Sequence, residues 1–166
     1  MAYPTESCYG LGCDPDNEAA IKRLLKLKKR PRAKGLILIA EKFERLKPFL
    51  LPLPEEKFQL MMNSWPGPYT WVCPSQSHTS RWLTGDHKTL AVRVTAHPVA
   101  ARLCQQAGMA IVSTSANVSA QPALRNAASV KRYFADEIDA IVNGSIGYAD
   151  APSTITNAIT GEIIRS

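Results

Sequence analysis

The chain has 166 residues, 45% of them hydrophobic, which is enough for one core and predicts a single domain. No apolar run approaches the roughly 20 residues of a membrane span and no signal segment is visible, so we expect a cytoplasmic protein without a membrane partner. The net charge of +6 comes from one block: residues 22–34 hold eight of the 20 Lys and Arg and no acid. Charge concentrated in this way predicts a binding site for phosphate or another anion.

The cysteines and histidines show no spacing typical of a disulfide framework or a metal site. Cys8, Cys13, Cys73 and Cys104 form no close pairs, and no histidine falls at a ligand interval beside them. We therefore expect reduced, mostly structural cysteines and no metal-ligating residues. The chain also lacks the motifs of a P-loop, a dinucleotide-binding fold and an α/β-hydrolase, so none of these explains the cations.

The predicted elements alternate between helices and strands. Residues 4–12 predict a loop in which Gly10 and Gly12 let the backbone approach a ligand. A first helix is predicted over 17–29, capped by Asp16 and ended by Pro31. Apolar runs predict buried strands at 36–40, 69–73, 90–94 and 110–113, and a 3.6-residue period predicts helices at 55–65, 97–107 and 126–138. With a terminal hairpin over 153–166, this order predicts an α/β or mixed α/β sheet.

The basic block divides at the end of the first predicted helix. Lys22, Arg23 and Lys26 lie within the helix, where a solvated face is the simpler interpretation. Four more cations flank the helix end and a proline-fixed turn, and we expect several of them to converge on a pocket at the edge of the sheet. Stabilisation of the helix dipole accounts for one or two of the four. They are Lys28, Arg30, Arg32 and Lys34.

Two further features are polar groups associated with predicted strands. Residues 113–119 contain five hydroxyl or amide side chains at the carboxyl end of a strand, where an open α/β sheet binds ligands. A turn whose side chains cap their own backbone is about equally well supported. Arg93 lies within the apolar run 90–94, and burying an unpaired cation costs several kcal/mol. We favour a position facing a polar cavity over one on an exposed edge strand.

Six segments together resemble the YrdC/Sua5 family in their order and spacing, over nearly the whole chain. The resemblance is greatest to the short members, which lack the additional C-terminal domain of Sua5. One such segment would be weak evidence, but six in register are specific. The segments are PTESCYGLG (4–12), LKLKKRPRAKGLILI (25–39), WPGPYTWVC (65–73), LAVRV (90–94), VSTSANVSA (112–120) and STITNAITGEIIR (153–165).

The resemblance implies a fold and a reaction. The fold is a single-domain, twisted, open mixed α/β sheet with flanking helices and a concave basic cavity. The reaction joins L-threonine, bicarbonate and ATP, carried as a Mg²⁺ chelate, into threonylcarbamoyl-adenylate and pyrophosphate. It is the first step toward N6-threonylcarbamoyladenosine at position 37 of tRNA, so tRNA and downstream threonylcarbamoyl-transferase proteins are implied partners. Such a step needs in-line positioning and charge neutralisation more than a protein nucleophile.

The resemblance also implies roles for individual residues. We expect Lys28 and Arg30 to stabilise the charge that develops in the reaction. The implied contacts to ATP come from Arg30, Lys34, Thr89, Asn117 and Arg165. The implied contacts to threonine come from Thr5, Arg93, Ser115 and Ser153. These assignments agree with the chemistry, because cations meet phosphates, an arginine grips a carboxylate and hydroxyls read a small polar substrate.

The chain departs from the family pattern at four places. Family members usually carry a further helix and the body of a strand before AYPTE, so we expect these to be missing. Ala120 stands where Gly is common and would be strained if the position needs a positive φ. Thr95 replaces a frequent Pro and Asn157 a frequent Asp. We expect none of these three residues to contact a ligand.

A second function is compatible with the same basic surface. A catalytically silent relative would bind tRNA or ribosomal RNA through a concave cationic surface, with a steep salt dependence. The enzyme is favoured because a protein that binds an RNA backbone does not need short-range recognition groups. Those groups are Arg93, Ser115, Asn117 and Ser153.

Overall fold

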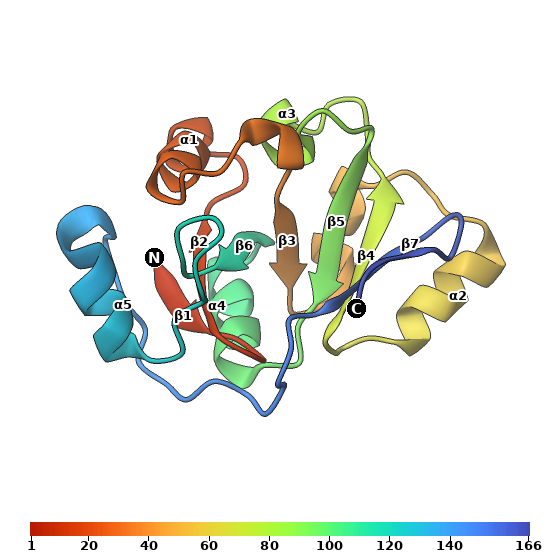
Figure 1. Cartoon of the computed structure of the whole chain (residues 1–166). Helices are drawn as coiled ribbons and strands as arrows, with labels where there is room; N and C mark the ends of the chain where they lie inside the picture. Colours follow the sequence, from red (N-terminus) through yellow and green to blue (C-terminus); the bar gives the residue numbers. More distant parts are fainter.

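The computed structural model describes residues 1–166, except for the side chain of Ala135. Its strands form one sheet in the order β1-β2-β6-β3-β5-β4-β7-β8 (Figure 1). β3 pairs in parallel with β5 and β4 with β7, whereas the other neighbours are antiparallel, so the predicted mixed α/β sheet is confirmed. The strands are β1 (Ala2–Pro4), β2 (Tyr9–Cys13), β3 (Ile37–Ala40), β4 (Tyr69–Pro74), β5 (Thr89–Val94), β6 (Ile111–Ser115), β7 (Thr154–Asn157) and β8 (Ile163–Arg165).

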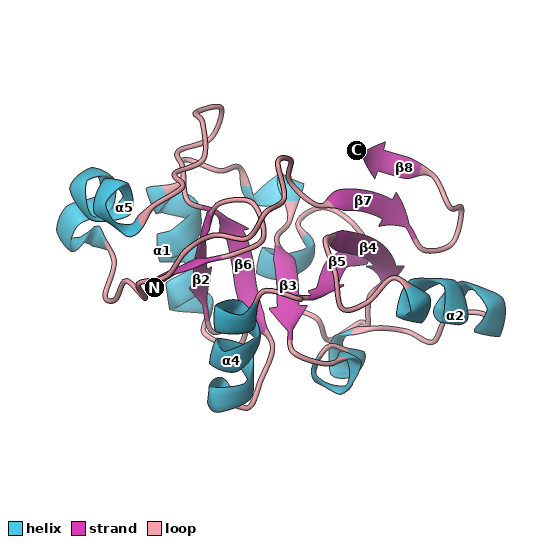
Figure 2. Cartoon of the chain, turned by 90° about the horizontal axis from the view of Figure 1, so that it is seen from below, coloured by secondary structure: helices cyan, strands magenta, loops and turns pink.

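Helices surround this sheet, and α5 and α2 lie at its opposite ends in both cartoon views (Figures 1 and 2). The α-helices are α1 (Glu18–Leu27), α2 (Glu55–Asn63), α3 (Arg81–Thr84), α4 (Pro98–Ala107) and α5 (Ala127–Phe134). Short 3₁₀ turns occur at Arg32–Lys34, Phe43–Arg45, Lys47–Phe49 and Ala135–Glu137. In the part of the chain described here, no helix has both the length and the apolar character that crossing a bilayer requires.

The two faces of the sheet are covered differently. On one face, Leu38 and Val92 belong to the main core together with Ile21 of α1 and Met61 of α2. On the other face, a smaller core joins Ile39 of β3 to Ala100 and Cys104 of α4, and further residues of that face line a cavity. The fold therefore packs one face of the sheet into the main core, whereas the other face carries a smaller core and a cavity.

The N-terminal segment differs from the prediction. Residues 9–13 form strand β2 instead of a loop, and β2 pairs with both β1 and β6. The glycines of this segment have low strand propensity, which is why the pattern did not indicate a strand. A Cβ at Gly12 would lie 2.5 Å from the carbonyl oxygen of Val112, so glycine here permits close contact between neighbouring backbones.

Other elements match the predictions with smaller differences. The N-cap of α1 is Asn17 and not Asp16, because the Asn17 side chain accepts a hydrogen bond from the Ala20 N–H at 2.9 Å. The four-residue helix α3 was not predicted, since it is too short to show a period. The terminal hairpin is confirmed as β7 and β8. Ala120 has a φ of 68°, which confirms the positive φ that would strain a residue other than glycine.

Candidate functional site

A cavity of about 900 Å³ lies on the second face of the sheet, within the size range of small-molecule sites. Ser113, Thr114 and Ser115 of β6 line it, together with alternate residues of the central strand β5, namely Thr89, Ala91 and Arg93. Because successive side chains of a strand point to opposite faces, this pattern places the site across the face of the sheet. Loop residues at the strand ends, such as Lys34 before β3 and Asn117 after β6, line it as well, so the cavity includes the predicted edge of the sheet and extends from there across its face.

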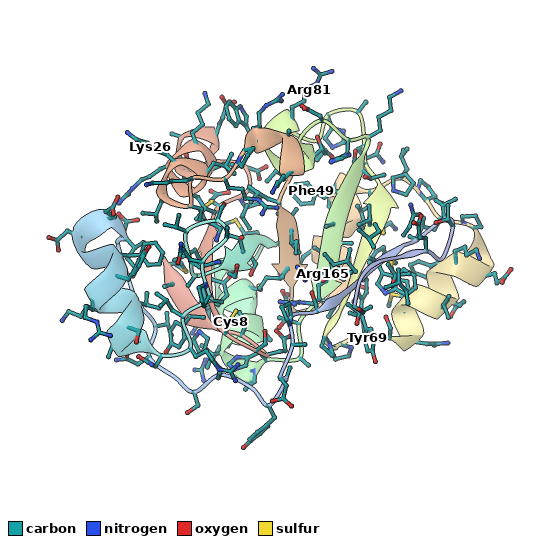
Figure 3. The ribbon with its side chains drawn as sticks, viewed as in Figure 1. Cys8, Lys26, Phe49, Tyr69, Arg81 and Arg165 are labelled. Atoms are coloured by element: carbon teal, nitrogen blue, oxygen red, sulfur yellow. The ribbon has the colours of Figure 1, made fainter. Side chains whose placement is uncertain are left out.

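Residues from both ends of the chain contribute to this cavity. Figure 3 shows Cys8 and Arg165 near the middle of the molecule, whereas Lys26 and Arg81 point outward at its periphery. Cys8 follows β1 and Arg165 belongs to β8, strands that occupy opposite ends of the sheet order, yet both residues line the cavity. The sheet must therefore curve around the site, as twisted sheets do.

The cavity wall is strongly cationic. Asp150 is the one acid among the described residues that line it. Burial, followed by the charge of Arg165, lowers the pKa of Arg30, and burial, followed by the charge of Arg93, lowers the pKa of Arg165. Guanidinium groups that repel one another across a partly buried site favour an anionic ligand. The lysines and arginines that line the cavity are Arg30, Lys34, Arg93, Arg125 and Arg165.

The cations that follow α1 do not all reach the cavity. Arg30 lines it, and its Nε and Nη2 donate to the Gly35 carbonyl at 3.1 and 3.0 Å, which fixes the guanidinium. Lys34 also lines it. Arg32 does not, because it forms an exposed ion pair with Asp86 at 2.7 Å. The prediction that several of these residues converge on one pocket is thus confirmed for two of them.

Lys28 is buried and is not among the residues that line the cavity. Its Nζ donates to the Ser115 carbonyl, to the Asn117 carbonyl at 2.8 Å and to Asn117 Oδ1 at 3.1 Å. Burial, and then the charge of Arg30, lowers the pKa of Lys28 to about 8. The structure therefore places this ammonium behind the loop that follows β6 and not at the cavity wall.

The loop after β6 fits both interpretations of its sequence, as a turn that caps its own backbone and as a loop that offers polar groups to a ligand. Ser115 Oγ donates to Asn117 Oδ1 at 2.6 Å and Asn117 Nδ2 donates to the Gln121 carbonyl, as expected of a loop that satisfies its own polar groups. Both Ser115 and Asn117 also line the cavity. The internal hydrogen bonds thus fix side chains that a ligand can reach.

Arg93 occupies a central strand, since β5 lies between β3 and β4. Its side chain is 11% exposed and its Nη2 lies 3.3 Å from Glu6 Oε2. The Arg93 Nε is buried and has no hydrogen-bond partner among the described residues. Because Arg93 also lines the cavity, the prediction that it faces a polar cavity is confirmed and the exposed edge strand is excluded.

The remaining predicted residues are held by short polar contacts. Thr5 Oγ1 donates to the Cys8 carbonyl at 2.8 Å, and Ser153 Oγ lies 2.8 Å from Thr70 Oγ1. Arg165 Nη2 donates to the Ser153 carbonyl at 2.8 Å, which links the two chain segments before and within the terminal hairpin. Of the predicted ligand-binding residues, those that line the cavity are Thr5, Arg30, Lys34, Thr89, Arg93, Ser115, Asn117, Ser153 and Arg165.

Sequence reasoning missed several lining residues. Cys8 was assigned a structural role, although the predicted glycine loop was a signal that could have included it. Asn157 lines the cavity, so the expectation that it stays away from the ligand is not supported. Nothing in the local pattern distinguished the other residues from surface polar positions. They are Ser7, Thr84, His87, Gln121, Arg125 and Asp150.

Several known proteins resemble this chain in sequence over nearly its whole length. The chain matches the model of the Sua5/YciO/YrdC family, described as "Telomere recombination", over residues 1–166. It is 52% identical over 165 residues to the threonylcarbamoyl-AMP synthase of Halorhodospira halophila, covering 99% of this chain and 86% of that protein. Its identity to the threonylcarbamoyl-AMP synthase of Methylobacillus flagellatus is 49% over 165 residues, covering 99% and 91% of the two chains.

A solved structure shares the fold and contains a ligand. The crystal structure of P. abyssi Sua5 in complex with L-threonine superposes with a TM-score of 0.87 at 36% identity. The match covers 94% of this chain and 46% of that chain, so this chain spans about half the length of Sua5. The expected absence of a preceding helix and strand stays a prediction.

Proposed function

The chain belongs to the Sua5/YciO/YrdC family, and on this premise we propose that it catalyses the reaction of a threonylcarbamoyl-AMP synthase. The substrates are L-threonine, bicarbonate and ATP, and the products are threonylcarbamoyl-adenylate and pyrophosphate. The observation that carries the proposal is the convergence of Arg30, Arg93 and Asn117 on one cationic cavity. The high identity to synthases over nearly the whole chain supports it.

The proposed chemistry has two steps. The threonine amine combines with bicarbonate to form a carbamate, with loss of water. A carbamate oxygen then attacks the α-phosphorus of ATP, the bond between that phosphorus and its bridging oxygen to the β-phosphate breaks, and pyrophosphate leaves. Negative charge accumulates on the leaving group, so fixed cations beside it lower the barrier. Orientation of the two substrates within one cavity supplies the rest of the catalysis.

We assign the residues to the two substrates by their chemistry. Arg30, Lys34 and Arg165 bind the phosphates of ATP, with Thr89 and Asn117 as further polar contacts. The proposed threonine contacts are Thr5, Arg93, Ser115 and Ser153. Lys28 acts in this proposal through the loop whose carbonyl groups it binds.

Mg²⁺ enters the proposal as part of the ATP substrate. Within the described residues, no cluster of three or more His, Cys, Asp or Glu side chains is arranged to hold a metal, and Asp150 is the one carboxylate at the cavity wall. Mg²⁺ is often held mainly by substrate phosphates and water, so phosphate oxygens would supply its main ligands. We also propose that the adenylate is passed, in the cytoplasm, to threonylcarbamoyl-transferase proteins that modify tRNA.

Pyrophosphate release from ATP tests this function. We expect release to require both L-threonine and bicarbonate, and a threonylcarbamoyl-adenylate product to appear in equal amount. Release without threonine, or no release with all three substrates, would contradict the proposal. Tight tRNA binding without turnover would instead support the RNA-binding alternative.

A further inference from the structure

Glu6 connects the proposed threonine site to three segments of the chain but does not line the cavity itself. It lies in the turn between β1 and β2, next to Thr5. Its side chain is 13% exposed, and its Oε2 lies 3.3 Å from Nη2 of Arg93. Glu6 is therefore positioned to act on a ligand through Arg93 without touching it.

Hydrogen bonds fix the carboxylate of Glu6. Its Oε1 accepts from Thr95 Oγ1 at 2.7 Å and from the Ala96 N–H at 3.2 Å. Thr95 Oγ1 in turn accepts from the His97 N–H at 3.2 Å. Burial raises the pKa of Glu6, but the charge of Arg93 and these hydrogen bonds outweigh that effect and hold the pKa below its usual value. The carboxylate is therefore ionised at neutral pH.

The backbone of the same turn holds the segment that leads to Ser153. The Glu6 carbonyl accepts from the Ala149 N–H at 3.1 Å, and the Thr5 carbonyl accepts from the Gly147 N–H at 2.9 Å. A Cβ at Gly147 would lie 2.8 Å from the Glu6 carbonyl oxygen, so the two segments are in close contact. Three of the four proposed threonine contacts thus belong to segments that meet at Glu6.

We infer that Glu6 is a positioning residue, which holds Arg93 and the Thr5 turn in the arrangement that binds the threonine carboxylate. This inference rests on the proposed function. The Nη2 of Arg93 pairs with the Glu6 carboxylate, while the Arg93 Nε is buried without an acceptor. Arg165 lies near enough for the two guanidinium groups to repel each other. Without the Glu6 charge, Arg93 would lose the carboxylate that fixes it against that repulsion.

The variant Glu6→Gln separates charge from shape. Gln keeps the oxygen that accepts from Thr95 and Ala96 but presents an amide N–H to Arg93. We expect the Kd of L-threonine, measured by calorimetry, to rise about 10-fold to 100-fold. The Kd of ATP should change less than about twofold, because Arg30 and Lys34 do not contact Glu6. Asp139→Asn is the matched control, since it removes the acid from the exposed pair with Arg23 and should change neither Kd.

The outcomes distinguish this inference from the proposed function. If the unaltered protein binds threonine and Glu6→Gln binds it equally well, or if both substrates weaken together, the positioning role is wrong and the function stands. If the unaltered protein binds no threonine and releases no pyrophosphate, the proposed function itself fails. Should Glu6→Gln not fold, Thr95→Val decides, because loss of its hydroxyl should weaken threonine binding about 3-fold to 10-fold and leave ATP binding unchanged.

Discussion

The cations of α1 and the cations of the cavity have the same charge but different surroundings. Lys22 and Arg23 lie on the exposed face of α1, where Lys22 pairs with Glu18 at 2.5 Å and Arg23 with Asp139 at 2.9 Å. Arg93 is 11% exposed, pairs with the carboxylate of Glu6 and faces a cavity whose charged lining residues, apart from Asp150, are all cations. Exposed pairs are screened by water, whereas partly buried cations act strongly on an anion. Burial and partners, and not the density of charge in the sequence, therefore decide where the anion binds.

The largest expected effect tests this comparison directly. Arg30→Ala should reduce pyrophosphate formation by about 10²-fold to 10³-fold, because it removes a fixed cation from the site of developing charge. Arg23→Ala, seven positions earlier in the same basic block, should leave turnover unchanged. Steady-state rates at saturating threonine measure both. Equal losses in the two variants would show that the two regions do not differ as described.

Lys28 differs from both groups of cations, because its side chain is buried but does not line the cavity. Lys28→Met keeps most of the side-chain volume and leaves the Ser115 and Asn117 carbonyls without their donor. We expect a loss of about 1 to 3 kcal/mol in the free energy of unfolding and of about 10²-fold in turnover, as the loop shifts. Denaturant titration and initial rates check the two effects. A stable variant with normal turnover would remove Lys28 from the functional site.

A pH series refines the role of Lys28. Its pKa is about 8 in the folded protein and 10.5 in the reference state, so between these values the unfolded chain binds more protons. The contribution of Lys28 to stability is therefore full above pH 10.5 and is lost as the pH falls through 8. The stability difference between the unaltered protein and Lys28→Met should thus grow from pH 8 to 10.5, while turnover of the unaltered protein declines above pH 8. Parallel stability curves would contradict this assignment.

The smallest expected effect concerns Ala120, in the loop that follows β6. Ala120 has a φ of 68°, a conformation that glycine adopts without strain. Ala120→Gly should raise the free energy of unfolding by about 1 kcal/mol and leave turnover unchanged. Thermal unfolding detects such a change as a shift of about 2 to 4 °C in Tm. A lower Tm would mean that the greater conformational entropy of the unfolded chain with glycine outweighs the relief of strain.

Local patterns predicted most of the fold. The strands at 36–40 and 90–94 and the helix at 97–107 follow from runs of apolar residues and from their period, which depend on neighbours in the sequence. Strand β2 was missed because its glycines are placed there by contact with β6, a constraint that lies 100 residues away in the chain. Tertiary contacts of this kind leave no local signal.

The candidate site was predictable in composition and partly in position. Arg93 stood out because a cation interrupts an apolar strand, and the structure places it at the cavity. The alternation of Thr89, Ala91 and Arg93 with larger apolar residues was visible in the sequence and indicated the face of the sheet, but it was interpreted as burial on both faces. The sequence did not indicate that Arg30 lines the cavity and Arg32 does not. Arg32 instead pairs with Asp86, a residue 54 positions away in the chain.

A crystal structure of this protein with L-threonine and a non-hydrolysable ATP analogue tests the central claim most directly. We expect the triphosphate within hydrogen-bond distance of Arg30 and Lys34 and the threonine carboxylate on Arg93. A triphosphate bound to Lys22 and Lys26 on the outer face of α1, with the cavity free of ligand, would contradict the claim that partly buried cations of the sheet face form the binding site.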